Sequence, residues 1–366
     1  FRCAIAFAAA WIALSMPCTA AAAELFVQTR PAMGTNFTIY LYARNAQHAS
    51  ATFEAAFEEI ERLEEALSNY RPSSELSRIN RVAAQEEVTT DPEVFGLLQT
   101  SLDYSRRTNG AFDITVGPLM RAWGFFRGQG HYPTPEELAH ARQTVGWQKV
   151  KMNAADHSVR FTTPGVEIDL GAIGKGYTVD RVVDVIREAG ITAALVDAGS
   201  STLYALGAPP GKNGWLVQVP RPGDREHTVS TVVLRDQSLS TSGSYEKFFQ
   251  LNGRRYCHIM DPRTGKPVEN VLQTTVIAPD GTTTDALSTS MFVMGPSAGK
   301  ELLESVPHAS GLWMMGEQAS PRMVAWNWGG CKSGFDQDCA MNKMAQHNQI
   351  PVENAGINQG KVLHKR

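Results

Sequence analysis

Apolar residues recur at helical spacing in several stretches of the chain. In residues 47–68 they lie three or four positions apart, which predicts a helix with one buried face. Capping signals mark other helix starts, because Asp91-Pro92 and Thr134-Pro135 combine a side-chain cap with a first-turn proline. The predicted helices are 47–68, 92–108, a segment that begins at 134, one over 179–186 that ends at Gly190, and 284–294.

Between these helices lie short runs of alternating or clustered apolar, aromatic and β-branched residues. Turn signals rather than helices separate several of them, so we expect mainly antiparallel sheet and an α+β fold class. The predicted strands are 37–42, 150–152, 159–161, 193–196, 215–219, 231–234, 255–260, 274–278 and 312–315. From about Gly329 the pattern gives way to Gln, Asn, Lys and Gly, which predicts a mobile tail over 329–366.

The first 23 residues differ from the rest of the sequence. Residues 1–16 are nearly all apolar with Arg2 as their one charge, and a run of small residues then ends at Ala23. An apolar core too short to span a bilayer, followed by an Ala-x-Ala site, is typical of a secretory signal peptide. We therefore expect a cleaved signal peptide over 1–23, a domain over 24–328 and a periplasmic location. A retained anchor is the alternative, while the residues before Cys18 match a lipid-attachment site poorly.

Composition narrows the possible partners. The 366 residues are 43% hydrophobic and 19% charged, with a formal net charge of -3, so nothing points to nucleic acid or an anionic membrane. Signal-peptide cleavage would leave Cys257, Cys331 and Cys339. In an oxidising compartment the last two could pair and leave Cys257 buried and free. The sequence has no Cys-x-x-Cys, so a zinc ribbon or thioredoxin motif is not supported.

Residues 167–177, Glu-Ile-Asp-Leu-Gly-Ala-Ile-Gly-Lys-Gly-Tyr, combine three glycines with Lys175 at a strand-to-helix junction. Backbone N–H groups at such a junction can face a phosphate, and the lysine adds positive charge. The segment is not a Walker A loop, because Asp169 stands where that motif has its first glycine and Gly176 where it has Ser or Thr. An ordinary glycine-rich turn is the alternative interpretation.

Two further segments carry side chains suited to metal or proton chemistry. If Thr-Asp-Ala-Leu-Ser-Thr is helical, Asp285, Ser288 and Thr289 lie on one face, and such oxygen ligands suit Mg²⁺ rather than zinc. The alternative is a helix start capped by Thr284 or Asp285. His258 lies just before an Asp-Pro turn and is either a general base or a structural histidine.

Three more segments could bind a nucleotide or serve only capping and packing. They are Met33-Gly-Thr at a strand start, 67–80 around Tyr70, and 111–119 directly after a helix stop. In this order and spacing, the six segments resemble the ApbE family of FAD:protein FMN transferases from about Met33 to Gly295. One departure is Asp-Ala-Gly-Ser-Ser-Thr at 197–202, where family members often have Gly-Gly-Asp.

The resemblance implies a two-lobed α+β domain of mainly antiparallel sheets with flanking helices and an FAD cleft between the lobes. It implies that Mg²⁺ is bound by the Ala172 carbonyl, Asp285 and Thr289, with Ser288 at a further ligand position. It makes His258 and Asp285 the catalytic residues, with His258 as general base and with the Tyr70 ring stacked on the flavin or adenine. The implied FAD-binding residues are Met33, Tyr70, Ala111, Phe112, Asp113, Asp169, Lys175 and Ile259, with the Phe112 ring also stacking.

The function implied by the resemblance is Mg²⁺-dependent transfer of the FMN moiety of FAD to a Thr or Ser hydroxyl, with release of AMP. The acceptor is expected to be a membrane-associated redox protein that faces the same compartment. Two alternatives stay open. One is an FAD pyrophosphatase, in which water replaces the hydroxyl, and the other is a non-catalytic flavin-binding protein of the envelope.

Overall fold

An eight-stranded sheet forms the centre of the protein in the computed structural model, which describes residues 23–128, 130–329 and 331–332. Every neighbouring pair in this sheet runs antiparallel, as predicted. The strands, in order across the sheet, are β1 (Glu24–Ala32), β2 (Thr35–Ala43), β6 (Ala194–Ala198), β7 (Thr202–Leu206), β10 (Gln237–Gly243), β15 (Val271–Ala278), β16 (Ser310–Met315) and β17 (Arg322–Trp326).

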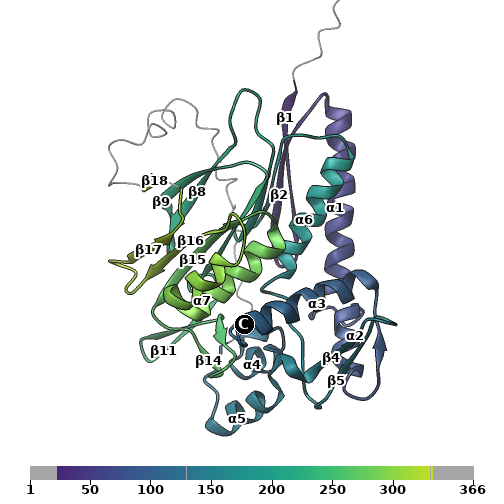
Figure 1. Ribbon diagram of the computed structural model, residues 1–366, viewed down its shortest axis with the longest axis vertical. Helices are drawn as coiled ribbons and strands as arrows, with labels where there is room; N and C mark the ends of the chain where they lie inside the picture. Colours follow the sequence, from purple (N-terminus) through teal and green to yellow (C-terminus); the bar gives the residue numbers. More distant parts are fainter. Residues whose placement is uncertain (1–22, 129, 330, 333–366) are drawn as a thin grey trace, which may run out of the picture.

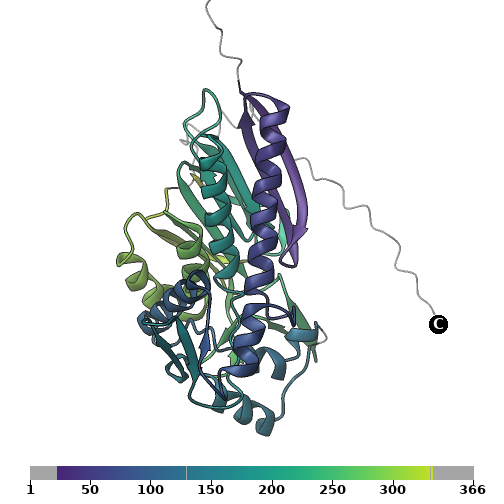
Figure 2. The same ribbon diagram turned by 90° about the vertical axis from the view of Figure 1, so that its right-hand side faces the viewer.

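Three helices cover one face of the large sheet. Figure 2 shows α1 (Ala46–Leu67, purple-blue) and α6 (Gly174–Glu188, teal) side by side along β1 and β2. Their apolar stripes form one core with β2 and β6, to which α1 contributes Phe53 and α6 contributes Val182. The third helix, α7 (Gly281–Glu304), packs against β10, β15 and β16, and its first turn touches α6.

The opposite face of the large sheet is covered by a three-stranded sheet of β8 (Trp215–Arg221), β9 (Asp224–Leu234) and β18 (Cys331–Lys332). Trp215 and Val232 of this small sheet share a core with Leu239 of β10. β18 falls in the segment that the sequence pattern assigned to a mobile tail, and its two residues pair with β9. The rest of the predicted tail, including Cys339, lies outside the described residues, as does most of the predicted signal peptide.

A second lobe forms the lower part of Figure 1 and packs against α7. Its core contains Leu76, Leu98 and Phe161 together with Leu287 and Met291 of α7, so α7 contributes to both lobes. The lobe comprises α2 (Glu75–Val82), α3 (Pro92–Arg107), α4 (Gly117–Ala122), α5 (Pro135–Thr144), the 3-10 turns Phe125–Arg127 and Trp147–Lys149, the sheet of β3 (Val88–Thr89), β4 (Val150–Asn153) and β5 (Ser158–Phe161), and the hairpins β11–β12 (Phe248–Leu251, Arg254–Cys257) and β13–β14 (Met260–Asp261, Lys266–Pro267).

The predicted helices all form, but several predicted boundaries are wrong, among them the start of β9, which lies at Asp224 and not at 231. The helix expected over 284–294 begins earlier and runs to Glu304, with a kink where Gly295 adopts a φ of 73° before Pro296. The strand expected over 255–260 is interrupted at His258 and Ile259, which lie between β12 and β13. Within the described part of the chain, no helix has the length and apolar character needed to cross a bilayer. Cys257 is buried as an unpaired thiol, and burial raises its pKa to about 11.

Candidate active site

The first turn of α6 is the point at which the candidate segments meet. The Gly176 N–H donates a hydrogen bond to Asp285 Oδ2 of α7 at 2.9 Å. The two helices approach so closely here that a Cβ atom on Gly176 would lie 2.1 Å from the Gly281 carbonyl oxygen. Only glycine fits this contact, which explains the glycine at position 176.

The hydroxyl-bearing face of α7 is oriented as its sequence spacing predicted. The cap of α7 is Asp280, which accepts the Thr283 N–H at 2.7 Å, so neither Thr284 nor Asp285 serves as the cap. The hydroxyls of Ser288 and Thr289 instead lie 2.9 and 3.2 Å from Ser242 Oγ of β10. These side chains therefore share one face of α7, turned toward β10.

The oxygen atoms around Asp285 suit a hard cation. Asp285 is 5% exposed, and within the described ranges its carboxylate has no cationic partner; it accepts only from Gly176 N–H and, at 3.5 Å, from Ser240 Oγ. A buried carboxylate without a cation is costly, so a bound divalent ion would compensate its charge. Among the described residues, no three His, Cys, Asp or Glu side chains lie close enough together to hold a metal ion. An ion bound to Asp285 would therefore need neutral oxygen ligands as well.

Positive charge and a histidine lie beside the same turn. Lys175 Nζ donates to the Gly171 carbonyl at 3.3 Å. The positive charge of Lys175 also acts on His258, which belongs to the second lobe. Desolvation, together with the Lys247 and Lys175 cations, lowers the pKa of His258 to about 4. His258 Nδ1 is 3.1 Å from the Lys247 carbonyl, which can only accept. Nδ1 therefore carries the hydrogen, and Nε2 keeps a free lone pair.

Asp169 joins two further segments to the site. Its carboxylate accepts from Asn69 Nδ2 at 3.1 Å and from Gly171 N–H at 2.8 Å, while its own N–H donates to the Ile114 carbonyl at 2.7 Å. Tyr70, beside Asn69, is 59% exposed, so it is not a core aromatic. Burial of part of the ring and the nearby Asp169 charge raise the Tyr70 pKa.

The exposed ring of Tyr70 already has an aromatic neighbour. It stacks on Phe126, with ring centroids 4.6 Å apart and planes 15° from parallel. The Arg121 guanidinium also lies over the Phe126 ring, 3.8 Å from its centroid, and forms a two-bond ion pair with Glu167. This arrangement presents a planar apolar surface next to Asp169, where a flavin or adenine ring could stack.

Four of the expected FAD-binding residues have buried side chains. The stacking role expected for Phe112 is wrong, because its ring is 2% exposed and packs in the core near Tyr104. The Asp113 carboxylate is buried and holds the local loop, accepting from Thr115 and from the Trp147 N–H. The other two are Ala111 and Ile259, which are buried as well. These positions can contact a ligand through the backbone or by shaping the loop, but not through an exposed side chain.

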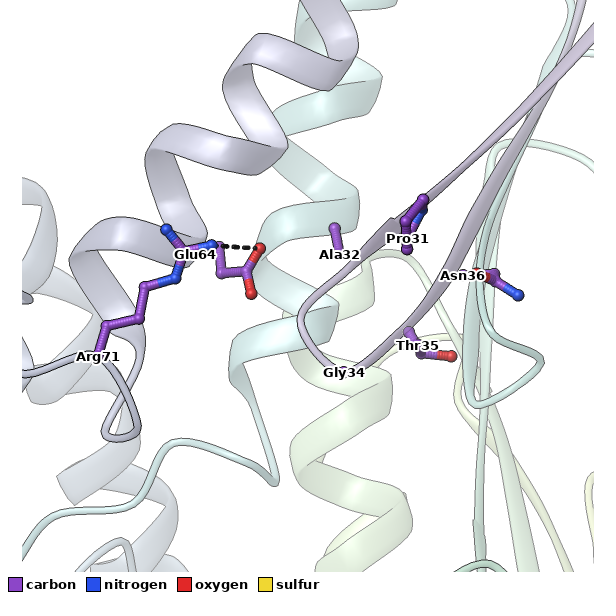
Figure 3. Close-up of a pocket in the computed structure, with 7 residues that line it drawn as sticks. All are labelled: Pro31, Ala32, Gly34, Thr35, Asn36, Glu64 and Arg71. Carbon is purple, nitrogen blue, oxygen red and sulfur yellow. Dashed lines mark ion pairs between the residues drawn. The ribbon is translucent and has the colours of Figure 1, made fainter. Parts of the chain in front are cut away.

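Met33 lies at the edge of a hollow between the β1–β2 turn and the end of α1. The hollow has a volume of about 530 Å³, and Figure 3 shows Gly34 and Thr35 on one side, with Glu64 and Arg71 on the other. Met33 itself occupies the turn, with a φ of 50°. Arg71, which lines the hollow, follows Tyr70 of the aromatic surface directly in the chain.

The loop that departs from the family pattern borders both the hollow and the hydroxyl cluster. A Cβ atom on Gly199 would lie 1.8 Å from Thr35 Oγ1, so the loop touches the β1–β2 turn. Ser200 adopts a φ of 62°, a left-handed conformation that favours glycine. The Ser201 carbonyl accepts from Ser240 Oγ at 2.9 Å, which connects this loop to the oxygens near Asp285.

β10 was not predicted, although its sequence held a signal. Ser238, Ser240 and Ser242 alternate along the strand, the period that places side chains on one sheet face. A role for Asp180 of α6 was not predicted either; its carboxylate accepts from the Gly281 N–H at 2.6 Å and from the Thr282 N–H at 2.8 Å. Asp180 thereby fixes the start of α7 against α6.

Comparison with known proteins identifies the family. The sequence model of the ApbE family matches residues 33–313. The chain is 31% identical to the FAD:protein FMN transferase of Escherichia coli (strain K12) over 293 residues, which cover 78% of this chain and 83% of that protein. It is 32% identical to the FAD:protein FMN transferase of Treponema pallidum over 298 residues, which cover 77% and 82% of the two chains.

Solved structures agree with this assignment. The ApbE protein of Thermotoga maritima superposes with a TM-score of 0.76 at 30% identity, covering 83% of this chain and 97% of that one. The apo form of the flavinyl transferase ApbE of Pseudomonas stutzeri gives a TM-score of 0.74 at 27% identity, covering 84% and 96%. The two-lobed α+β fold, the meeting of distant segments at the start of α6, and these matches all lead to one conclusion: the chain belongs to the ApbE family of flavin transferases.

Proposed function

We propose that this protein transfers the FMN moiety of FAD to a Thr or Ser hydroxyl of a redox protein, depends on Mg²⁺ and releases AMP. Family membership supports flavin transfer, since the relatives are named FAD:protein FMN transferases. The observation that carries the finer proposal is the meeting of Lys175, Asp285 and His258 around the first turn of α6. Phosphoryl transfer needs mainly positioning and charge neutralisation, to which a cation and a metal-binding carboxylate can contribute, while a neutral imidazole can accept a proton.

Magnesium would be held by the Ala172 carbonyl, the Asp285 carboxylate and the Thr289 hydroxyl. In a regular helix the Gly176 N–H would donate to the carbonyl four residues earlier, that of Ala172. It donates to Asp285 instead, which leaves the Ala172 carbonyl free of this bond. Ser288 Oγ is fully buried and donates to the Asp285 carbonyl at 3.0 Å, which favours a supporting position behind the ligands. When bound, Mg²⁺ supplies charge neutralisation and Lewis-acid polarisation of the pyrophosphate.

The pyrophosphate itself would lie against the start of α6. This helix has no side-chain cap and no acidic residue in its first turn, so its amide dipoles favour an anion there. The Lys175 ammonium beside the same turn adds a full positive charge. Together these groups neutralise charge on the phosphate that leaves with AMP.

The transfer step balances with His258 as the proton acceptor. The acceptor hydroxyl oxygen forms a bond to the FMN-side phosphorus, the pyrophosphate P–O bond breaks, and AMP leaves with the bridging oxygen. The hydroxyl proton passes to His258 Nε2, which is free because Nδ1 is held by the Lys247 carbonyl. The imidazole is neutral at pH 7, because its pKa is about 4, and the negative charge of bound FAD would raise that pKa toward the range of an effective base.

The acceptor is proposed to face the periplasm. The signal-peptide pattern of residues 1–23 supports export, and covalent flavin would then be added to a membrane-associated redox protein that faces that compartment. Either alternative function would use the same FAD site. A pyrophosphatase would release AMP from FAD in the absence of any acceptor, and a binding protein would release none.

Replacing Asp285 tests the proposal. The Asp285→Asn variant keeps the side-chain size but removes the buried negative charge, so transfer of flavin to a co-expressed redox subunit should fall at least 100-fold. The readout is in-gel flavin fluorescence that survives denaturation, with AMP release measured in parallel. Asp103→Asn, a change at an exposed position of α3, is the matched control and should keep wild-type transfer. Wild-type transfer by Asp285→Asn would contradict the metal assignment.

A further inference from the structure

A second hollow lies on the flank of the second lobe, apart from the residues assigned to FAD. It has a volume of about 740 Å³ and is formed by α5, the β13–β14 hairpin, the start of β12 and one residue of α7. In Figure 1, β14 lies just below α7 and beside α4. Its charged lining residues are Arg142, Arg254, Arg263, Lys266, Asp261 and Glu269.

Positive charge is in excess in this hollow. Two of its four cations are paired inside it, Arg254 with Glu269 at 2.7 Å and Arg263 with Asp261 at 2.9 Å. Arg142 donates only to the Arg263 carbonyl, at 3.1 Å, and neither it nor Lys266 has an ion-pair partner in the part of the chain that the structure describes. Because the whole chain has a formal net charge of -3, this excess is a local property and favours an anionic ligand.

Two lining residues of the hollow connect it to the proposed active site. Val268, which lines it, donates its N–H to the Ile259 carbonyl at 2.9 Å, and Ile259 follows His258 directly. On α7, the lining residue Val293 is four positions after Thr289 and therefore on the same helix face, one turn away. A polypeptide whose hydroxyl reaches His258 would extend over this surface.

Resting on the proposed function, we propose that this basic hollow binds an acidic segment of the acceptor protein, next to the Thr or Ser that receives FMN. The cations are exposed, as a surface that recruits a macromolecule requires. The Arg254–Glu269 pair is itself exposed, so exchanging its partner for an acceptor carboxylate costs little. Complementary charge of this kind speeds association and selects among acceptors.

Peptide binding tests the proposal without knowledge of the natural acceptor. The probes are two fluorescein-labelled 12-residue peptides with a central Thr, one with four Asp or Glu residues and one with Asn and Gln in their place. Fluorescence anisotropy with the full chain, with and without FAD, gives the Kd of each. We expect the acidic peptide to bind at least tenfold more tightly at low salt and to lose this preference as salt is raised.

Charge variants assign the preference to the hollow. Lys266→Glu should abolish the tenfold preference, and Lys266→Gln should weaken it without reversing the charge. Arg44→Glu is the control, since residue 44 is exposed just before α1 and is not among the residues that line the hollow. Equal binding of the two peptides, or equal losses in Lys266→Glu and Arg44→Glu, would overturn the proposal.

The affinity for FAD, measured by flavin fluorescence, separates this proposal from the proposed function. We expect Lys266→Glu to leave the Kd for FAD within twofold of wild type. A tenfold rise would mean that the hollow holds FAD and not the acceptor, and would also overturn the proposal. If wild-type protein bound no FAD, the proposed function would fail, whatever the peptides did.

Discussion

Replacing Gly176 by alanine tests the contact that joins α6 to α7. The added Cβ atom would lie 2.1 Å from the Gly281 carbonyl oxygen and 2.7 Å from Asp285 Cβ. Ordinary van der Waals contacts begin at 3.4 Å, so the two helices would have to separate by about 1 Å. Because Asp285 is on one helix and the Ala172 carbonyl lies just before the other, this separation would open the proposed magnesium site.

The expected magnitudes follow from two opposing effects. Alanine favours a helix over glycine by about 1 kcal/mol, whereas overpacking a tight contact costs about 1–3 kcal/mol. We therefore expect a modest net loss in the free energy of unfolding, up to about 2 kcal/mol. The transfer rate should fall much further, since a 1 Å misplacement of reacting groups can cost about 100-fold.

The assay pairs urea denaturation with the rate of FMN transfer across a range of Mg²⁺ concentrations. Gly174→Ala is the matched control in the same helix turn, because its Cβ atom would make an ordinary contact of 3.7 Å with Leu170. It should keep wild-type transfer and be as stable as wild type or more stable, by up to about 1 kcal/mol. A Gly176→Ala variant that is more stable than wild type and transfers FMN at the wild-type rate would refute this reasoning.

Three further changes test other parts of the site. Lys175→Met should raise the Kd for FAD roughly 30-fold, as expected when a charge-assisted contact worth about 2 kcal/mol is lost, and flavin fluorescence measures it. His258→Gln should slow transfer about 100-fold or more without weakening FAD binding. In wild type, the free energy of unfolding should decrease as the pH falls from 6.5 toward 4, because His258 takes up a proton more readily in the unfolded chain than in the folded one. Urea denaturation at each pH should show that His258→Gln lacks this decrease. Asp180→Asn should raise the Mg²⁺ concentration for half-maximal transfer about tenfold, since Asp180 fixes the start of α7. Burial raises the pKa of Asp180 to about 6, so in wild type this Mg²⁺ concentration should also rise as the pH falls through about 6. Unchanged values in these titrations would remove the residue concerned from its role.

Local geometry was predictable from the sequence, because helix and strand periods depend on neighbouring residues. The spacing of Asp285, Ser288 and Thr289 predicted a shared face, and their contacts with β10 confirm it. The start of α3 followed from Asp91, which caps it by accepting the Glu93 N–H at 2.8 Å. Such features need no knowledge of distant contacts.

Long-range packing was not predictable in the same way. Gly176 and Asp285 are 109 residues apart, and nothing local indicates that their helices touch. Phe112 stands in a family motif, yet it is buried in the core of the second lobe, where its ring packs near Tyr104 of α3. β10 was missed because its serines are not among the residue types enriched in strands, and pairing with β7 and β15 is what makes it a strand.

The proposed metal site is tested most directly by a crystal structure with FAD and Mn²⁺, whose anomalous scattering locates the ion. The account predicts one ion bound by the Ala172 carbonyl, Asp285 and Thr289, in contact with the pyrophosphate of FAD at the start of α6. FAD bound in the cleft with no ion at Asp285, or with the ion held by other residues, would contradict it.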